Sequence, residues 1–364
     1  MNDPAIGPSS PRSVAVVPGE GAAPEAVAAA LDVVDQLALP IVWTHPPVGE
    51  AAVASHGSHF PDEARAALDA ADATLFGATS GASAGALFHL RWGRQTYANV
   101  RPTRFRPGFS SPLSRPDGID FVIVRENLED LYLFLEGDLA DLAPLDLTSP
   151  TQGRKAHELG PGRYAIKAIT EAGSERVIRR GFELARHRSA AGHPGRVTVA
   201  AKTNMLPQTD GLFARIGEQV AADYPDIEHQ SFIVDDFAHR LVARPHDLDV
   251  VVLPNLYGDI LSDAAAALAG GLGLAASACF GDDYAYFESA HGTADDIAGL
   301  GIVNPTATML SAGLMLEHLG FDAAARSLDE AISAVYAAGK DLTPDQGGTA
   351  STAAFTAAVI GALR

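Results

Sequence analysis

The sequence predicts an α/β fold, because short apolar strands alternate with amphipathic helices along most of the chain. Residues 13–21, SVAVVPGEG, have the pattern of a strand that enters a glycine turn. The predicted helix behind it covers 24–38, with Pro24 near its start, a position that favours proline. Later strands are expected in 72–78, 119–127, 196–204, 231–236 and 247–255. Polar residues follow most of these strands, which is where open α/β sheets bind ligands.

Helices are expected at 171–188 and 306–320, and after residue 260 the chain becomes rich in Ala and Gly and is expected to be largely helical. The weakly patterned segment 137–163 is either a projecting arm or an ordinary loop. Residues 1–11 are expected to be a disordered tail.

Size and charge limit the possible functions. The chain has 364 residues, more than one hydrophobic core usually holds, so two domains are expected. A formal net charge of -19 argues against nucleic acid or an anionic membrane as a partner. The single cysteine, Cys279, allows no intrachain disulfide. The N-terminus lacks the apolar core of a signal peptide and no run of 18 apolar residues occurs, so a cytoplasmic location is expected.

Three arginines are candidates for binding a carboxylate substrate. Arg91 and Arg101 lie ten positions apart in LRWGRQTYANVRP, and Arg125 follows in VREN. The guanidinium fork matches the two oxygens of a carboxylate. Three of them together would bind a di- or tricarboxylate; taken alone, they could equally form surface salt bridges.

Three aspartates have the chemistry of metal ligands. Asp259 and Asp263 are four apart in NLYGDILSD, so they share one face of a helix. Asp235 ends the predicted strand SFIVDD. Oxygen ligands suit Mg²⁺ or Mn²⁺. The alternative interpretation is that these aspartates are solvated acids that bind no metal.

Lys202 follows the predicted buried strand in AAKTNMLP. A lysine held near a metal ion and arginines can accept a proton near neutral pH. A lysine that only extends along the surface is the alternative. A further segment, HGTADDIAGLGIVNPTA from His291, is too polar for a core strand and too rich in glycine for a helix. It is typical of a loop shaped around a ligand.

Together these segments resemble the β-decarboxylating dehydrogenase family, which includes isocitrate, homoisocitrate, 3-isopropylmalate and tartrate dehydrogenases. The resemblance runs from VVPGEGAAPE to QGGTASTAAFTAAVIGAL and depends most on ANVRP, VREN, NLYGDILSD and HGTADDIAG. It implies two α/β domains with the active-site cleft between them. The larger domain would combine 1–96 with 270–364, and the smaller, 97–269, would carry a dimer interface. No Rossmann GxGxxG motif occurs.

The resemblance also implies roles for single residues. Arg91, Arg101 and Arg125 would hold the carboxylates of a malate. Tyr132 would protonate the enol. Lys202 would help remove the hydroxyl proton, with Asn204 as its neighbour at the substrate. The metal ligands would be Asp235, Asp259 and Asp263. Lys202 and Asp235 would come from the partner subunit, which implies a homodimer with shared active sites, or a tetramer built from such dimers.

For the cofactor, the loop at 291 resembles the family's adenosine-binding loop. His291 would contact the adenine and Asn304 its edge. Asp296 would accept hydrogen bonds from the ribose hydroxyls and repel a 2′-phosphate, whereas members that prefer NADP have Lys-Tyr in place of Asp296-Ile297. NAD is therefore the expected cofactor. The other expected contacts are Glu288, Gly292, Thr293, Ala294 and Ile297.

The chain departs from the family pattern at several positions. PGEG replaces PGDG, Ser289 replaces the proline of E-P-x-H, Asp295 replaces that of A-P-D, and Leu128 stands where threonine is usual. None of these removes a catalytic group.

The stretch before Arg91, GATSGASAGALFHLR, is the family's specificity region. It is short, and Gly85, Leu87 and Phe88 stand where other members place polar contacts for a third carboxylate. This apolar lining suits an alkyl group, although VREN and the C-terminal third look closer to the homoisocitrate or tartrate branches. The expected substrate is therefore D-malate or a 3-substituted (R)-malate.

Two alternatives stay open. Other distal substrate contacts could come from Ser83, His89 or Arg94. A non-catalytic regulatory subunit on the same fold is the alternative function. The joint presence of Tyr132, Lys202 and the three aspartates argues against it.

Overall fold

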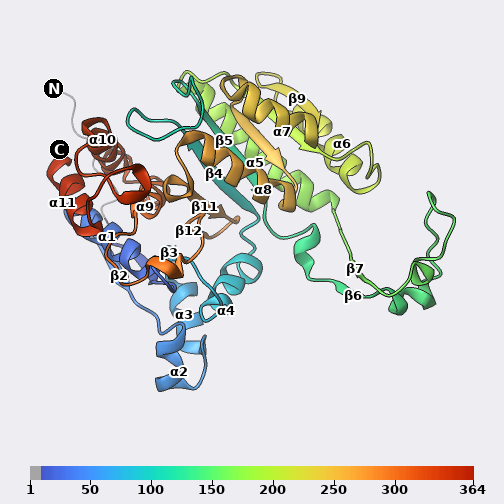
Figure 1. Cartoon of the computed structure of the whole chain (residues 1–364), viewed down its shortest axis with the longest axis horizontal. Helices are drawn as coiled ribbons and strands as arrows, with labels where there is room; N and C mark the ends of the chain where they lie inside the picture. The colour runs from blue at the N-terminus through green and yellow to red at the C-terminus, as the bar shows by residue number, and fades with distance from the viewer. Residues whose placement is uncertain (1–9) are drawn as a thin grey trace.

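The computed structural model describes residues 10–364, so most of the predicted tail at 1–11 lies outside the described residues. One ten-stranded sheet runs through the molecule in the order β2-β1-β3-β12-β11-β4-β5-β10-β8-β9 (Figure 1). The strands of this sheet are β1 (Arg12–Val17), β2 (Ile41–Thr44), β3 (Ala73–Phe76), β4 (Ala98–Arg104), β5 (Asp120–Glu126), β8 (Arg196–Ala201), β9 (Glu228–Ile233), β10 (Val250–Leu253), β11 (Ala276–Phe280) and β12 (Ala285–Ser289).

The sheet is parallel at both ends and antiparallel in its middle. β11 pairs antiparallel with β12 and β4, and β4 pairs antiparallel with β5. The strands on the β11 side come only from 12–76 and 276–289, and those on the β4 side only from 98–253. The two predicted domain segments therefore meet at the β11–β4 pair, although the domain bounds themselves stay a prediction.

Helices cover both halves of the sheet (Figure 1). The α-helices are α1 (Ala23–Asp35), α2 (Glu50–His56), α3 (Asp62–Ala70), α4 (Ala84–Phe88), α5 (Glu171–Ala190), α6 (Thr209–Ala221), α7 (Val234–Ala243), α8 (Asn255–Ala269), α9 (Thr306–His318), α10 (Asp322–Ala338) and α11 (Thr352–Ala362). None of the helices in residues 10–364 is long and apolar enough to cross a membrane.

Each half has its own apolar core. In the first, α1, α9, α10 and α11 pack on β1, β3 and β12, with Val33, Met315 and Phe355 fully buried. In the second, α5 and α6 pack on β5, β8 and β10, with Phe182 fully buried. Phe109 belongs to the smaller predicted segment but packs in the first core, on the ring of Tyr336 at 4.6 Å.

The structure differs from the sequence prediction after residue 260. The Ala-rich segment there was expected to be helical, but β11 and β12 form an antiparallel hairpin in the centre of the sheet. Small side chains such as Ala278 and Ala285 fit this position because helices cover the sheet closely. Buried strands of small residues carry little β pattern in the sequence.

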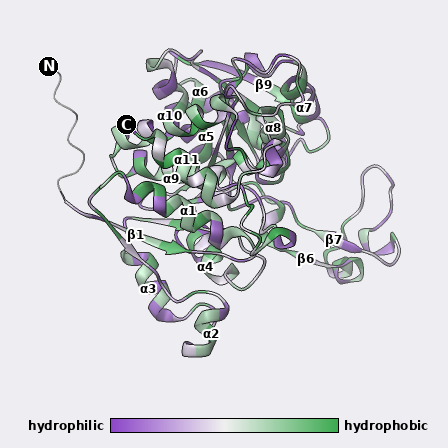
Figure 2. Ribbon diagram, turned by 60° about the vertical axis from the view of Figure 1, so that its left-hand side comes forward, coloured by the Kyte–Doolittle hydropathy of each residue, from purple (hydrophilic) through white to green (hydrophobic). Residues whose placement is uncertain are grey.

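Segment 137–163 is a projecting arm and not an ordinary loop (Figure 1). β6 (Glu136–Asp138) and β7 (Arg163–Ala165) form its two-stranded stem, and the short 3-10 helices η3 (Leu139–Leu145) and η4 (Ala156–Glu158) lie toward its tip. Figure 2 shows apolar and polar residues interleaved along this arm. Its large exposed apolar side chains, with those at its base, are Phe134, Leu135, Leu145, Leu147, Leu159 and Ile166.

Candidate active site

The three arginines predicted to bind substrate meet at one place. β4 and β5 pair so that Arg101 and Arg125 lie on neighbouring strands, and Arg91 lies in the π-helix η1 (His89–Gly93). Arg91 and Arg125 both donate to Oδ1 of the buried Asn255, at 3.3 and 2.8 Å. Burial, with the charges of Arg91 and Arg101, lowers the pKa of Arg125 to about 10. The guanidinium stays charged at neutral pH, and the cluster is suited to an anion.

Asn255 was not predicted from the sequence. It begins α8, and its side chain also donates to the backbone oxygen of Glu129 at 3.2 Å. The amide therefore fixes the directions of two arginines. The only signal in the sequence was its place at the end of DLDVVVLPN, where ligand-binding polar residues are expected.

Asp259 and Asp263 of α8 face the arginines. Arg125 hydrogen-bonds Asp259, and Nη1 of Arg101 lies 3.1 Å from Oδ1 of Asp263. Burial raises the pKa of Asp263; Arg101 opposes this rise, and the like charge of Asp259 adds to it. The helix spacing therefore brings both carboxylates to one face, as the sequence predicts.

Tyr132 lies in the same place. It belongs to the 3-10 turn η2 (Leu131–Leu133), and its hydroxyl donates to Oδ2 of Asp259 at 2.6 Å. Arg125 stacks on its ring, with the guanidinium carbon 4.9 Å from the ring centre. Burial and the bond to Asp259 raise the pKa of Tyr132, so the phenol holds its proton at neutral pH.

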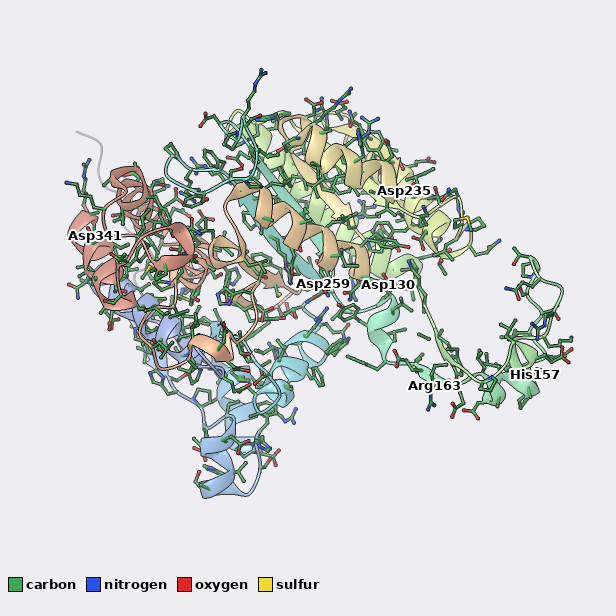
Figure 3. The ribbon with its side chains drawn as sticks, viewed as in Figure 1. Asp130, His157, Arg163, Asp235, Asp259 and Asp341 are labelled. Atoms are coloured by element: carbon green, nitrogen blue, oxygen red, sulfur yellow. The ribbon has the colours of Figure 1, made fainter. Side chains whose placement is uncertain are left out.

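Lys202 and Asp235 form a separate pair. Nζ of Lys202 lies 2.6 Å from Oδ1 of Asp235, in the first turn of α7. The ammonium holds the pKa of Asp235 below its usual range. Figure 3 shows Asp235 well apart from Asp259. Asn204 is exposed near Lys202. A single chain thus does not unite all the predicted catalytic groups.

The carboxylates of one chain do not by themselves form a site for a divalent metal ion among the described residues. In the part of the chain that the structure describes, no group of three or more His, Cys, Asp or Glu is arranged to hold a metal. Asp259 and Asp263 supply two partly exposed carboxylates on one helix face, and Asp235, which is largely exposed, is available to a second copy. The oxygen donors fit Mg²⁺ or Mn²⁺ only if two chains contribute.

The loop after β12 contains the predicted cofactor contacts. Nδ1 of His291 lies 2.8 Å from the backbone oxygen of Gly292, while the buried Nε2 has no hydrogen-bond partner among the described residues. Burial lowers the pKa of His291, so the ring is neutral. Gly292, Ala294 and Asp296 are exposed, and Thr293 and Ile297 are half-buried. A buried nitrogen without a partner is free to bond a ligand.

Two further predicted cofactor contacts, Asn304 and Glu288, have polar or charged neighbours within the chain. The amide of Asn304 donates to Tyr336 and Asp345, and its oxygen accepts from the backbone of Thr306 at 3.0 Å. These bonds occupy the side chain internally. Burial raises the pKa of Glu288, and the positive charges of Arg101, Arg91 and Arg125 oppose the rise.

The two apolar specificity residues point in different directions. Leu87 is half-buried against the core cluster that includes Leu68 and Phe76. Phe88 is half-exposed, and its ring lies 5.1 Å from Trp92 and 6.1 Å from Phe134. The guanidinium of Arg91 stacks on Trp92. An aromatic cluster of Phe88, Trp92 and Phe134 therefore adjoins the arginines.

The polar residues nearby are already paired. His89 and Arg94 both bond Asp69 of α3, at 2.9 and 3.4 Å. Ser83 donates to Glu20 through both its hydroxyl and its backbone.

Glu20, like Asn255, has a structural role that was not predicted from the sequence. It appeared there only as part of PGEG, which departs from the family pattern. Its carboxylate also accepts from Thr79 at 2.6 Å and from the backbone of Ser80 at 2.8 Å. Burial works against ionisation, but the hydrogen bonds from Ser83, Thr79 and the backbone amides outweigh it and lower the pKa of Glu20. Glu20 therefore fixes the loop that leads into α4 and Arg91.

The chain is similar in sequence to known proteins over nearly its whole length. A family model described as isocitrate/isopropylmalate dehydrogenase matches residues 13–360. A 3-isopropylmalate/3-methylmalate dehydrogenase of Methanocaldococcus jannaschii is 41% identical over 342 residues, 94% of this chain and 96% of the relative. An isocitrate/homoisocitrate dehydrogenase of Thermus thermophilus is 41% identical over 358 residues, 96% of this chain and 98% of the relative.

The fold of the chain is also similar to that of a solved structure from this family. The crystal structure of isocitrate dehydrogenase from Methylococcus capsulatus has a TM-score of 0.83 against this chain at 35% sequence identity. The match covers 96% of this chain and 99% of the other. The predicted fold class and family resemblance are confirmed.

Proposed function

Because the chain belongs to the isocitrate/isopropylmalate dehydrogenase family and is a decarboxylating hydroxy-acid dehydrogenase, we propose that it oxidises D-malate or a 3-substituted (R)-malate with NAD and a divalent metal ion. The observation that carries this proposal is the arginine cluster beside Asp259 and Tyr132. It combines sites for the substrate carboxylates with a protonated phenol.

The roles of the chain's own residues follow from this arrangement. Arg91, Arg101 and Arg125 bind the carboxylates and orient C2 of the substrate. Lys202 helps to remove the proton of the C2 hydroxyl. NAD, when bound, supplies the hydride acceptor, and a divalent metal ion, when bound, supplies a Lewis acid beside the C2 oxygen. Tyr132 then donates a proton to the carbon that loses CO₂. Oxidation comes first, since only the ketone can accept the electron pair of the breaking bond.

Shared active sites in a homodimer are part of the proposal. The distance of the Lys202–Asp235 pair from Asp259 within one chain supports it (Figure 3). The arm supports it as well: Phe134 is 65% exposed and Leu145 61%, and such apolar surface favours contact with a second copy. Whether dimers pair further into a tetramer, and the cytoplasmic location, remain predictions from the sequence.

The substrate is an alkyl- or unsubstituted malate rather than a tricarboxylate. The support is the aromatic cluster of Phe88, Trp92 and Phe134, which offers no partner to a third carboxylate. A buried carboxylate without a partner costs at least a few kcal/mol. The names of the relatives include both 3-methylmalate and homoisocitrate as substrates, so the relatives alone do not decide between these two classes.

The test is NAD⁺ reduction by the purified protein with D-malate, tartrate, isopropylmalate, isocitrate and homoisocitrate, each with Mg²⁺ and with Mn²⁺. NADH formation is expected with D-malate or an alkylmalate and only weakly with the tricarboxylates. Formation of NADH from any of them excludes the non-catalytic regulatory subunit. If none is oxidised under any condition, the proposed activity is wrong.

A further inference from the structure

Lys167 lies between two fully buried aspartates just beyond the base of the arm. Its Nζ is 2.7 Å from Oδ2 of Asp210 and 3.5 Å from Oδ1 of Asp130. The ammonium also stacks on Tyr257 of α8, 4.5 Å from the ring centre. Burial would lower the pKa of Lys167, but Asp210 and Asp130 outweigh it, so the pKa is raised and the side chain stays charged. No role for this lysine follows from the site described above.

Asp130 connects Lys167 to the tyrosine loop. It has a backbone φ of 67°, a conformation that costs energy in any residue with a Cβ. Its carboxylate accepts from the backbone of Leu131 at 2.9 Å and of Leu256 at 3.1 Å. Leu256 lies in the first turn of α8, and Tyr132 follows two residues after Asp130. The strained residue thus joins the Tyr132 turn to the helix that holds Asp259.

Asp210 connects Lys167 to the lysine loop. It is fully buried in the first turn of α6, and its Oδ1 accepts from the backbone N–H of Lys202 at 2.8 Å. Its other oxygen bonds Lys167. A movement of Lys167 would therefore move Asp210 and, through its hydrogen bond, the backbone of Lys202.

We propose that Lys167 is a positioning residue that holds the Tyr132 turn and the Lys202 loop of one chain in a fixed arrangement. This inference rests on the proposed function. If the sites are shared, Tyr132 works in its own chain's site and Lys202 in the partner's site. The Asp130–Lys167–Asp210 network then links the two active sites of the dimer.

The physical reason is charge balance inside the protein. Two buried carboxylates with a single ammonium between them hold together only while the ammonium is present. Without it, the two aspartates repel each other, and each is attached to a different catalytic loop. Misplacement by about 1 Å can lower a rate by about 10²-fold, so small movements are sufficient.

The first test compares kcat and KM of Lys167→Met with wild type. A fall in kcat of about 10- to 100-fold, with a smaller change in KM, is expected from misplaced catalytic groups. Lys167→Arg should recover part of the loss, because it restores the charge. Arg186→Met is the control. Arg186 lies on α5 and forms an exposed ion pair with Asp226, and its loss should leave turnover unchanged.

A second variant guards against a folding defect. Asp130→Gly removes the carboxylate but suits the φ of 67°, which glycine adopts at little cost. It should lower kcat as Lys167→Met does, with an unchanged circular dichroism spectrum. Normal kcat in both variants would overturn the positioning role.

The link between sites is tested in mixed dimers purified through two different tags. A dimer of one Tyr132→Phe chain and one Lys202→Ala chain has a single site with both groups intact, and it should regain activity that neither parent shows. Lys167→Met is then added to one chain or to the other. The link predicts a lower turnover of the intact site in both cases, because one chain supplies its Tyr132 and the other its Lys202.

The outcomes separate the two proposals. If Lys167→Met lowers the turnover of the intact site from one chain only, the link between the two sites is overturned, and Lys167 positions only one of the two loops. No regained activity in the parent mixture would overturn shared sites, and the link with them, whereas kcat of Lys167→Met in the ordinary dimer would still decide the positioning role. Unchanged turnover with Lys167→Met on either chain would overturn the inference while the shared sites stand.

Discussion

The Tyr132 hydroxyl donates to Oδ2 of Asp259, while Arg125 bonds the other oxygen of the same carboxylate. One aspartate thus holds both an arginine that we propose binds the substrate and the phenol expected to act as an acid. Asp259 accepts from both groups and keeps them within reach of one ligand. A proton donor beside the carboxylate-binding groups is what the protonation of an enol requires.

Replacing Tyr132 with phenylalanine should lower kcat by about 10²–10⁴-fold, the usual scale for loss of a positioned acid. The ring and its stacking on Arg125 are kept, so substrate binding should change little. Steady-state NADH formation on the best substrate measures both parameters. A variant with near-normal turnover would remove Tyr132 from the mechanism.

Metal dependence follows from the carboxylates of α8. Thorough treatment with EDTA should abolish NADH formation, and added Mg²⁺ or Mn²⁺ should restore it. Asp263→Asn should raise the metal concentration needed for half-maximal activity, because an amide binds a divalent cation more weakly than a carboxylate. This variant leaves the Tyr132–Asp259 bond in place. Full activity after chelation would contradict the metal assignment.

The exposed carboxylate of Asp296 is expected to decide the choice between NAD and NADP. The wild type should use NAD⁺ better than NADP⁺, since Asp296 repels a 2′-phosphate and suits free ribose hydroxyls. Changing Asp296 to Lys together with Ile297 to Tyr should move the ratio of kcat/KM toward NADP⁺. The interpretation of this loop is wrong if the wild type already prefers NADP⁺.

Glu126 should make stability depend on pH. Burial raises its pKa from 4.5 to about 7, although the backbone amides of Glu129 and Leu128 oppose the rise. Between about pH 4.5 and 7 the folded chain therefore holds a proton that the unfolded chain has released. The free energy of unfolding falls as pH rises through this window, by up to about 3 kcal/mol.

Urea unfolding at pH 4.5 and pH 7.5 measures this effect. Glu126→Gln carries no titrating group at this position, so its stability should fall less than that of the wild type between the two pH values. The comparison uses the difference between pH values, because the amide also changes the hydrogen bonds at both. Equal pH slopes in the two proteins would show that Glu126 is ionised in the folded state.

Much of the fold and site follows from local patterns. The apolar runs that predicted strands at 119–127 and 196–204 contain β5 and β8, and the run at 13–21 covers all of β1 except its first residue, Arg12. Helical spacing correctly placed Asp259 and Asp263 on one face. These predictions succeed because the deciding interactions lie within a few residues of each other.

Other features depend on contacts between distant segments. The π-helix at η1 bonds the backbone N–H of Arg94 to the oxygen of His89, five residues back, so ordinary helical phase does not hold near Arg91. Leu87 and Phe88 therefore could not be oriented from their spacing alone. The ion pair of Asp130 with Lys167 joins residues 37 positions apart, and Asp130 has a positive φ. Neither feature produces a periodic pattern in the sequence that would predict it.

The distal pocket gives the last prediction. Phe88 contacts Trp92 and Phe134 and is half-exposed beside the arginine cluster, so it is the residue best placed to meet the substituent on C3 of the malate. Phe88→Arg should raise kcat/KM for homoisocitrate relative to an alkylmalate, because a guanidinium there can pair with the distal carboxylate. Leu87→Arg is the matched control: it neighbours Phe88 but packs toward the core, and it should destabilise the fold without the same gain. The deciding quantity is the ratio of kcat/KM for alkylmalate over homoisocitrate in each protein. If the wild type already prefers homoisocitrate, a group outside the aromatic cluster binds the third carboxylate. Trp92 and Phe134 would then have no part in specificity.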